Sequence, residues 1–140
     1  MSVSSKYIDT RTVVQEDLDA LNHVNNLQYL RWTLKAAAAH SSHVGWPSSR
    51  YRELGLGWIV RSHKITYKIP AKLHDEIAIH TWVASFDKVT SIRKYQIFRQ
   101  ADSQLCAVAE TRWAFVNMDT LRLTPIPAEV RRAFGVQDGH

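Results

Sequence analysis

The segment at residues 16–26, EDLDALNHVNN, contains most of the side chains in this chain that could do chemistry. Carboxylates, an imidazole and amides stand close together there, contributed by Asp17, Asp19, Asn22, His23, Asn25 and Asn26. Such residues favour turns and helix caps, because their side chains bond nearby backbone N–H groups. Capping one helix needs only one or two of them, so the surplus favours a functional site at the start of a helix.

This combination suits attack on a carbonyl carbon. The free N–H groups at a helix start stabilise negative charge, including the oxyanion that forms when a carbonyl is attacked. A carboxylate nearby can activate water as a general base or attack directly as a nucleophile. The chain has no Gly-x-Ser-x-Gly motif. Cys106, its one cysteine, lies in a predicted buried strand beside Ala and Val, which favours a core thiol.

The elements that must position these residues follow from the hydrophobic pattern. Residues 7–14 predict a strand, and residues 16–26 predict a loop that ends in a helix start. A helical period then sets in, carried by Leu27, Leu30, Leu34, Ala37 and Ala38. We expect a helix of about four turns, capped by Asn25 or Asn26, whose alanine run packs closely on a sheet.

The rest of the chain predicts strands and two short helical turns. Residues 45–57 predict a connection with a helical turn near residues 50–54, and residues 127–134 predict a short final helix. Four strands are expected between them, at residues 57–67, 76–86, 90–99 and 105–117, because apolar and polar residues alternate there. One long helix with an antiparallel sheet is an α+β arrangement in two layers. We expect a single domain over residues 1–140.

Charge and composition limit the function classes. The net charge is +5, and residues 50–99 alone carry ten Lys or Arg and four acidic residues. This excess indicates a solvated strand face or a site for an anionic ligand. Nucleic-acid binding stays a minor alternative. The polar start and the absence of a long apolar run predict a cytoplasmic protein without a membrane span. His40 and His43 suit the negative end of the helix dipole. They lack a third ligand, so no metal site is expected.

The residues around the loop resemble a known family. Asp17-Leu18-Asp19, His23-Val24-Asn25-Asn26 and Tyr29-Leu30 resemble the active-site segment of the hotdog-fold acyl thioesterases. The resemblance extends through residues 57–61, 67–71, 73–75 and 117–119, over nearly the whole chain. It is to the 4-hydroxybenzoyl-CoA thioesterase group, the bacterial long-chain acyl-CoA thioesterases and the plant acyl-ACP thioesterases. It implies a hotdog fold, an antiparallel five-stranded sheet curled around one long central helix.

The resemblance also implies roles for individual residues. Asp19 matches the catalytic carboxylate of the family. The backbone N–H of Asn26 matches the donor to the thioester carbonyl, and His23 matches the residue that orients water or the thioester. Asp17 is expected to be structural. Leu21 replaces the asparagine that the plant acyl-ACP enzymes carry. The candidates for substrate contact are Asn25, Tyr29, Trp58, Ile59 and Val60, with Arg61, Lys88 and Arg93 for the phosphates of coenzyme A.

Hydrolysis of an acyl-CoA thioester to a free acid and CoA is therefore the predicted function. Coenzyme A belongs to the substrate, and no separate cofactor is expected. The resemblance implies a homodimer, or a homotetramer built from two dimers, with each site at a subunit interface. A non-catalytic acyl-CoA or lipid-binding module on the same scaffold, an acyl-ACP thioesterase and, less favoured, a hotdog dehydratase are the alternatives. The acyl group stays open, as does the choice between nucleophile and general base.

Overall fold

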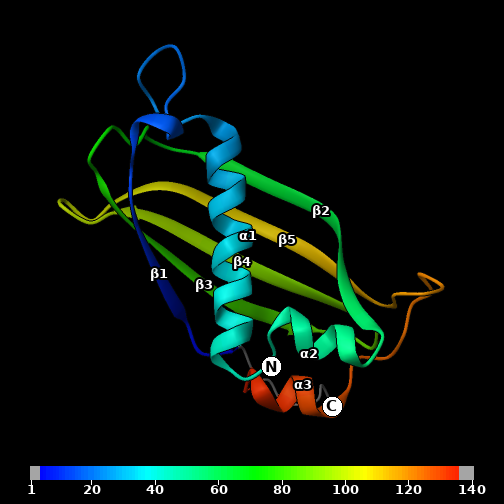
Figure 1. The fold of residues 1–140 in the computed structure, drawn as a ribbon. Helices are drawn as coiled ribbons and strands as arrows, with labels where there is room; N and C mark the ends of the chain where they lie inside the picture. The colour runs from blue at the N-terminus through cyan, green and yellow to red at the C-terminus, as the bar shows by residue number, and fades with distance from the viewer. Residues whose placement is uncertain (1–3, 136–140) are drawn as a thin grey trace.

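A single antiparallel sheet organises the chain. The structure is a computed structural model and describes residues 4–135. The strands that it gives within this range are β1 (Tyr7–Thr12), β2 (Leu56–Tyr67), β3 (Glu76–Phe86), β4 (Thr90–Arg99) and β5 (Gln104–Asn117). They lie in the order β1-β3-β4-β5-β2, so the sheet has β1 and β2 at its edges (Figure 1).

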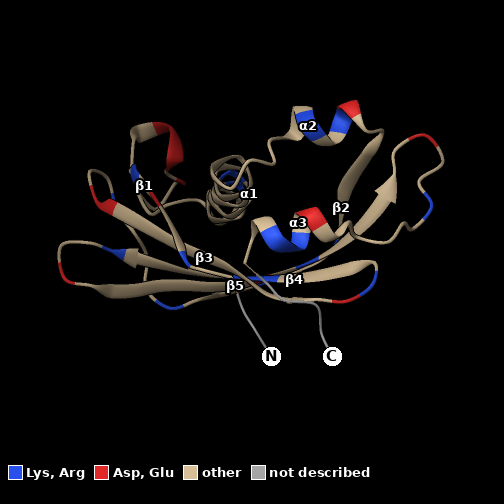
Figure 2. Ribbon diagram, turned by 90° about the horizontal axis from the view of Figure 1, so that it is seen from below, with Lys and Arg blue, Asp and Glu red and all other residues tan. Residues whose placement is uncertain are grey.

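The helices cover one face of this sheet. The long helix α1 (Asn26–His43) lies in its concave side, and the short helices α2 (Ser48–Glu53) and α3 (Ala128–Ala133) lie on the same side, near the C-terminal end of α1 (Figures 1 and 2). A single 3-10 turn, Gln15–Asp17, leads from β1 toward the loop that precedes α1. The expected α+β arrangement is confirmed, with a five-stranded antiparallel sheet around one long helix.

The strand predictions agree closely with the structure. Strands β3 and β4 have the predicted bounds, and β2 and β5 each begin one residue earlier than expected. Strand β1 ends at Thr12, two residues before the predicted end. Strand β5 alternates buried and less buried side chains over much of its length, as the sequence pattern predicts for a sheet with one covered face. Helix α2 begins before the predicted turn.

Helix α1 buries a different face from the one expected. Its buried residues are Tyr29, Trp32, Thr33, Ala36, Ala37 and His40. Leu27, by contrast, is 61% exposed, and Leu30 and Leu34 are only half-buried. The prediction that the leucine stripe faces the sheet is therefore wrong, apart from Ala37. The larger aromatic rings remove more apolar surface from water, so they take the sheet-facing positions and leave the leucines less buried.

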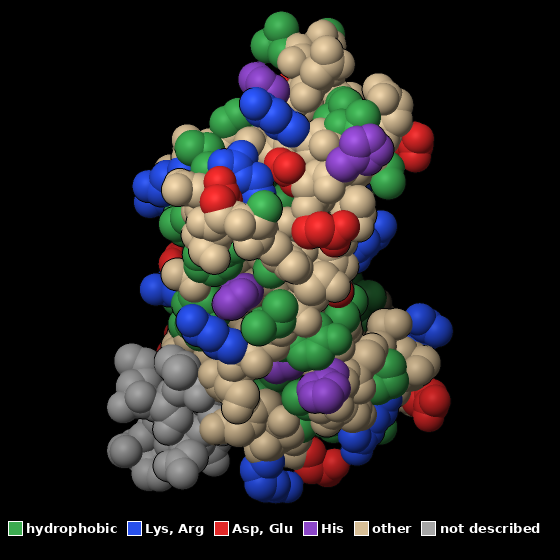
Figure 3. Space-filling view, turned by 90° about the vertical axis from the view of Figure 1, so that its left-hand side faces the viewer, with side chains coloured by type: hydrophobic (Ala, Val, Ile, Leu, Met, Phe, Trp, Pro, Cys, Tyr) green, Lys and Arg blue, Asp and Glu red, His purple; other side chains and the backbone are tan. Residues whose placement is uncertain are grey.

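Charges of both signs are mixed on the surface. On the face shown in Figure 3, Lys and Arg side chains are interspersed with Asp and Glu, and no large patch of one sign forms there. The charged positions of the ribbon are likewise scattered over helices and strand ends (Figure 2). Among residues 4–135, the helices are all too short or too polar to cross a membrane.

Candidate active site

The loop between the 3-10 turn and α1 is held together by its own backbone. Leu18 and Val24 form an isolated antiparallel bridge, and Asn25 donates its N–H to the carbonyl of Asp17 at 2.8 Å. The N–H of Val24 bonds to the carbonyl of Ala71 at 3.1 Å, which ties the loop to the segment after β2. These bonds fix where the loop leaves and re-enters the fold, while residues 19–22 project into solvent (Figure 1).

Asp19 uses one carboxylate oxygen to close this loop. Its Oδ1 accepts hydrogen bonds from the N–H groups of Leu21, at 2.8 Å, and His23, at 3.2 Å. The backbone turns sharply here, since Asn22 has a φ of 62°. Oδ2 of Asp19 forms no hydrogen bond with residues 4–135, and the side chain is exposed. The carboxylate is thus fixed by one oxygen and open to water or substrate through the other.

The start of α1 presents one unbonded amide. The side chain of Asn25 caps the helix, its Oδ1 accepting from the N–H of Leu27 at 2.9 Å, and the carbonyl of Asn25 accepts from the N–H of Gln28. Of the first three helical residues, Asn26 alone has an N–H without a partner among residues 4–135. This amide is therefore available to a negatively charged oxygen, which a helix start favours. Asn25 is the cap, and Asn26 is not.

Two further loop residues have distinct environments. Oδ2 of Asp17 accepts from the N–H of Val14 at 2.9 Å and closes the 3-10 turn, which agrees with the structural role expected for this residue. His23 is half-buried, and its ring makes no hydrogen bond with residues 4–135. An imidazole without a fixed partner beside Asp19 can turn toward a bound molecule, so its role stays a prediction.

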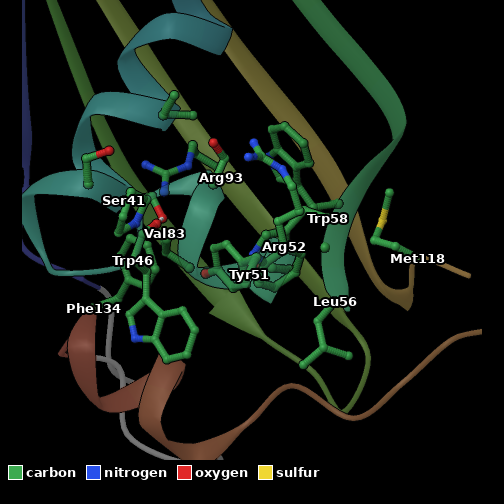
Figure 4. A pocket seen from close by; sticks show the side chains of 18 of the residues that line it. Ser41, Trp46, Tyr51, Arg52, Leu56, Trp58, Val83, Arg93, Met118 and Phe134 are labelled. Carbon is green, nitrogen blue, oxygen red and sulfur yellow. Dashed lines mark hydrogen bonds between the residues drawn. The ribbon is translucent and has the colours of Figure 1, made fainter. Parts of the chain in front are cut away.

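A cavity of about 710 Å³ lies at the other end of α1, between α1, α2, β2 and the sheet. We call it the α1–β2 cavity. Its walls are rich in aromatic rings, from Trp46, Tyr51, Trp58, Phe86, Trp113 and Phe134. In Figure 4, Ser41, Val83 and Arg93 lie on one side of it, and Leu56 and Met118 lie on the other. Gly57 also borders the cavity, and a side chain there would collide with Met118, since an added Cβ would come within 2.7 Å of its sulfur.

The structure separates the four residues proposed for the acyl pocket. Trp58 lines the α1–β2 cavity, whereas Ile59 and Val60 lie further along β2 and do not. Tyr29 is 2% exposed and belongs to the core, where its hydroxyl accepts from the N–H of Ala71 at 3.0 Å. Burial raises the pKa of this hydroxyl. Tyr29 therefore does not line the α1–β2 cavity, because its ring packs against Trp32 and Tyr67, and its contact with substrate stays a prediction.

The three basic residues proposed for the phosphates do not come together. Arg61 is exposed at an irregularity in the edge strand β2, between Val60 and Ser62, and Lys88 is exposed in the turn after β3. Arg93 is only 5% exposed and lines the interior of the α1–β2 cavity. Contact with the CoA phosphates would need Arg93 at an open surface, so its burial argues against the role expected for it. It lies on the same face of β4 as Tyr95 and Ile97, and this alternation in the sequence would have indicated an inward position.

The loop and the cavity lie at opposite ends of α1. An α-helix rises about 1.5 Å per residue, so Asn26 and Ala38 are about 18 Å apart along the axis. Ala38 lines the cavity, as do Ser41 and Ser42 beyond it. Strand β2 also runs from the cavity to the start of α1. Its last residue, Tyr67, donates from its hydroxyl to the carbonyl of Asn26 at 3.4 Å, and its first residues border the cavity.

The comparisons with known proteins agree with this architecture. Oleoyl-acyl carrier protein thioesterase 2 of Arabidopsis thaliana is 30% identical over 104 residues, which are 69% of this chain and 28% of the plant protein. The chain thus spans just over a quarter of the length of that relative. YneP of Bacillus subtilis, whose name presents it as a suspected acyl-CoA thioesterase, is 25% identical over 134 residues, which are 96% of this chain and 91% of that protein.

The fold has close counterparts among solved structures. Slr0204 of Synechocystis, a 1,4-dihydroxy-2-naphthoyl-CoA thioesterase, superimposes with a TM-score of 0.87 at 18% identity, over 93% of this chain and 96% of that one. The hotdog fold is thereby confirmed. The sequence profile of the thioesterase-like superfamily matches residues 13–134, which is most of the chain. The chain therefore belongs to the thioesterase-like superfamily.

Proposed function

We propose that this chain is an acyl-CoA thioesterase, in which Asp19 supplies the catalytic carboxylate and the N–H of Asn26 binds the oxyanion. The observation that carries the proposal is the pairing of an exposed, half-free carboxylate with the unbonded amide at the start of α1. Family membership supports the same reaction. Both groups belong to one loop, which backbone hydrogen bonds hold in place.

The chemistry needs only these groups and water. Water, deprotonated by Asp19, attacks the thioester carbonyl carbon, and the negative charge on the carbonyl oxygen is met by the Asn26 N–H. The C–S bond then breaks, and the CoA thiolate takes up the proton, so the products are a carboxylic acid and a thiol. In the alternative route the Asp19 carboxylate attacks the carbonyl carbon, the C–S bond breaks to release the CoA thiolate, and a mixed anhydride forms. Water then hydrolyses the anhydride, which releases the carboxylic acid, restores the Asp19 carboxylate and supplies the proton that the thiolate takes up. His23 would orient the water in either route.

The distance between loop and cavity favours a site shared by two copies. Strand β2 is an edge strand, and its exposed side chains include Val60 at 38% and Tyr67 at 44%. In a two-fold symmetric dimer with β2 paired antiparallel to its copy, the cavity end of one β2 meets the loop end of the other. We therefore propose a homodimer in which Asp19 of one chain acts on an acyl group held in the cavity of its partner. A homotetramer would add a second pair of such sites.

The carrier of the acyl group is tested separately. The plant relative acts on acyl groups carried by acyl carrier protein, according to its name, whereas Slr0204 is named for a CoA thioester. Both carriers end in the same pantetheine thiol. We propose CoA, in keeping with the full-length match to YneP. The same acyl group presented on CoA and on acyl carrier protein distinguishes the two, by the ratio of kcat/KM.

The decisive experiment changes the two aspartates of the loop. Asp19→Asn and Asp19→Ala should lower the rate of thiol release by about 10² to 10⁴, because the general base or nucleophile is lost. Asp17→Asn is the matched control, since its amide oxygen can still accept from Val14. Near-normal turnover in both Asp19 variants contradicts the assignment. Acyl-CoA binding without thiol release, unchanged in Asp19→Ala, indicates a binding module instead.

A further inference from the structure

The interior of the α1–β2 cavity contains a charge that the proposed reaction does not use. Arg93 lines the cavity and is 5% exposed. Its Nη1 donates to Nδ1 of His40 at 2.9 Å and to Oγ1 of Thr81 at 3.1 Å. The guanidinium also faces the ring of Phe134, 5.6 Å from its centroid. These contacts come from α1, β3 and the residue that follows α3, so several segments hold this side chain in place.

One edge of the guanidinium stays free. The hydrogen bonds of Arg93 all start from Nη1, and its Nε and Nη2 have no partner among residues 4–135. Nε and Nη2 point their N–H groups to the same side, which is the edge that binds the two oxygens of a carboxylate. The hydroxyl of Tyr51, also on the cavity wall, is buried and without a hydrogen-bond partner within the described range.

Within residues 4–135, no carboxylate forms an ion pair with Arg93. The ion pairs found within residues 4–135 join Arg11 to Asp9, Arg50 to Glu129 and Arg99 to Asp102. The cavity also has Arg52 and Asp119 on its wall, both of them exposed.

His40, the hydrogen-bond partner of Arg93, adds no charge at neutral pH. Burial and the neighbouring Arg93 lower the pKa of His40 to about 4. A buried charge without an opposite charge is unfavourable, so the surroundings of Arg93 favour an anionic ligand.

We propose that Arg93 binds a carboxylate at the far end of the acyl group, so that the substrates are CoA thioesters of dicarboxylic acids. This inference rests on the proposed function, because it places the acyl chain in the α1–β2 cavity. The aromatic walls would contact the methylene chain, and the free edge of Arg93 would bind the distal carboxylate with help from the Tyr51 hydroxyl. Arg93 is then a specificity-determining residue, and Asp19 of the partner chain does the chemistry.

The test compares matched acyl groups. The glutaryl, adipoyl and suberoyl thioesters of CoA are each paired with the acyl chain in which an isopropyl group replaces the distal carboxylate. In the unaltered protein at least one dicarboxylic thioester should exceed its partner in kcat/KM by about 10- to 100-fold, the effect of a hydrogen bond to a charged group. Arg93→Met should abolish this preference, and Arg93→Lys should keep part of it. Arg52→Met, which removes the exposed arginine of the same cavity, should leave it in place.

The preference is a ratio measured within one protein, so a partly folded variant does not change it. If Arg93→Met does not fold, the unaltered protein and Arg93→Lys decide the question. The inference is overturned if the isopropyl partner is preferred at all three lengths. It is also overturned if Arg93→Met keeps the preference, or if Arg52→Met loses it equally.

A binding measurement separates this inference from the proposed function. If thioesters of both kinds give no thiol release, the proposed function fails, and the cavity is then tested with non-reactive ligands. Adipic acid monoamide carries one carboxylate, and hexanamide carries none. Quenching of the cavity tryptophans Trp46, Trp58 and Trp113 should show that the acid binds about 10-fold more tightly, and only when Arg93 is present. Equal affinity for the two amides overturns the inference.

Discussion

His40 shows how burial can reverse the role suggested by a residue's position in a helix. Near the C-terminal end of α1, a protonated histidine would be stabilised by the helix dipole, as the sequence suggests. In the structure His40 is 3% exposed, stacks on Tyr7 and accepts a hydrogen bond from Arg93. Burial and the adjacent arginine outweigh the dipole and lower the pKa of His40 to about 4. His40 does lie in the last turn of α1, where the sequence placed it, but its burial disfavours the charged imidazole that the dipole would stabilise.

The lowered pKa of His40 makes the stability of the fold depend on pH. Between about pH 6.5 and pH 4 the unfolded chain binds this proton and the folded chain does not, so the free energy of unfolding falls as the pH falls. From pH 7 to pH 5, His40 should contribute a loss of about 2 kcal/mol. His40→Asn keeps an acceptor for Arg93 and has no proton to bind. Urea unfolding of both proteins at the two pH values measures this loss, and an equal loss in both contradicts the prediction.

Arg93 and Asp19 differ in how well the sequence predicts them. The loop around Asp19 is local, and its surplus of Asp and Asn in one short segment marks it before any fold is known. Arg93 is a single arginine in a strand, and such residues usually face solvent. Its burial depends on His40 and Phe134, which are about 40 to 50 positions away in the sequence and cover it only through tertiary packing. The alternation of residues in β4 indicates which face of the strand Arg93 lies on. The neighbouring sequence does not indicate which side chains surround it.

Helix α1 connects the loop to the sheet, and the cap of its first turn should affect both stability and activity. Asn25→Ala removes the Oδ1 that accepts from Leu27 and should lower the free energy of unfolding by about 1 kcal/mol. The freed amide of Leu27 would compete with that of Asn26 for the oxyanion, so kcat should fall as well. Asn25→Asp and Asn25→Ser restore a cap and should restore stability. Chemical denaturation and thiol release measure the two effects, and full stability in Asn25→Ala contradicts the role as a cap.

The sequence predicts strands better than it predicts the orientation of α1. Strand β3 and strand β4 were predicted to the residue, because one covered face imposes a two-residue period that short turns interrupt clearly. Helix α1 has two apolar stripes, and a helical period alone does not choose between them. Trp32 and Ala36 contact the core, while Leu27 and Leu34 face away from it. The choice depends on the size and curvature of the sheet, which the helix sequence does not contain.

The cavity could not be predicted from any one segment. Its walls come from α1, α2, β2, β3, β4, β5 and the residue that follows α3, which meet only in the folded chain. Of the residues proposed for substrate contact, Trp58 and Arg93 lie in this cavity, and Asn25 lies at the distant loop. A single copy therefore has the proposed carboxylate of Asp19 on a loop that lies away from the α1–β2 cavity. Among the described residues that line the cavity, Asp119 is the one carboxylate, and it is exposed. The interior of the cavity therefore has no carboxylate of its own for the reaction.

Complementation between two inactive variants tests whether copies share their sites. Asp19→Ala removes the proposed carboxylate, and Ala38→Trp fills the α1–β2 cavity from the exposed side of α1. Each variant alone should be inactive. If the loop of one chain and the cavity of its partner form one active site, a mixed dimer has one site with both changes and one site with neither. Equal co-expression makes about half of the dimers mixed, so about a quarter of the original activity should return.

The two variants are expressed together with different affinity tags, and the doubly tagged dimer is purified before thiol release is measured. About half of the original activity per dimer is then expected, since one of two sites is intact. A chain carrying both changes, paired with an unaltered chain, is the matched control. This control dimer has one defect in each shared site and should be inactive. If each site lies within one chain, the outcomes exchange: the control dimer keeps half of the activity, and the complementing dimer has none.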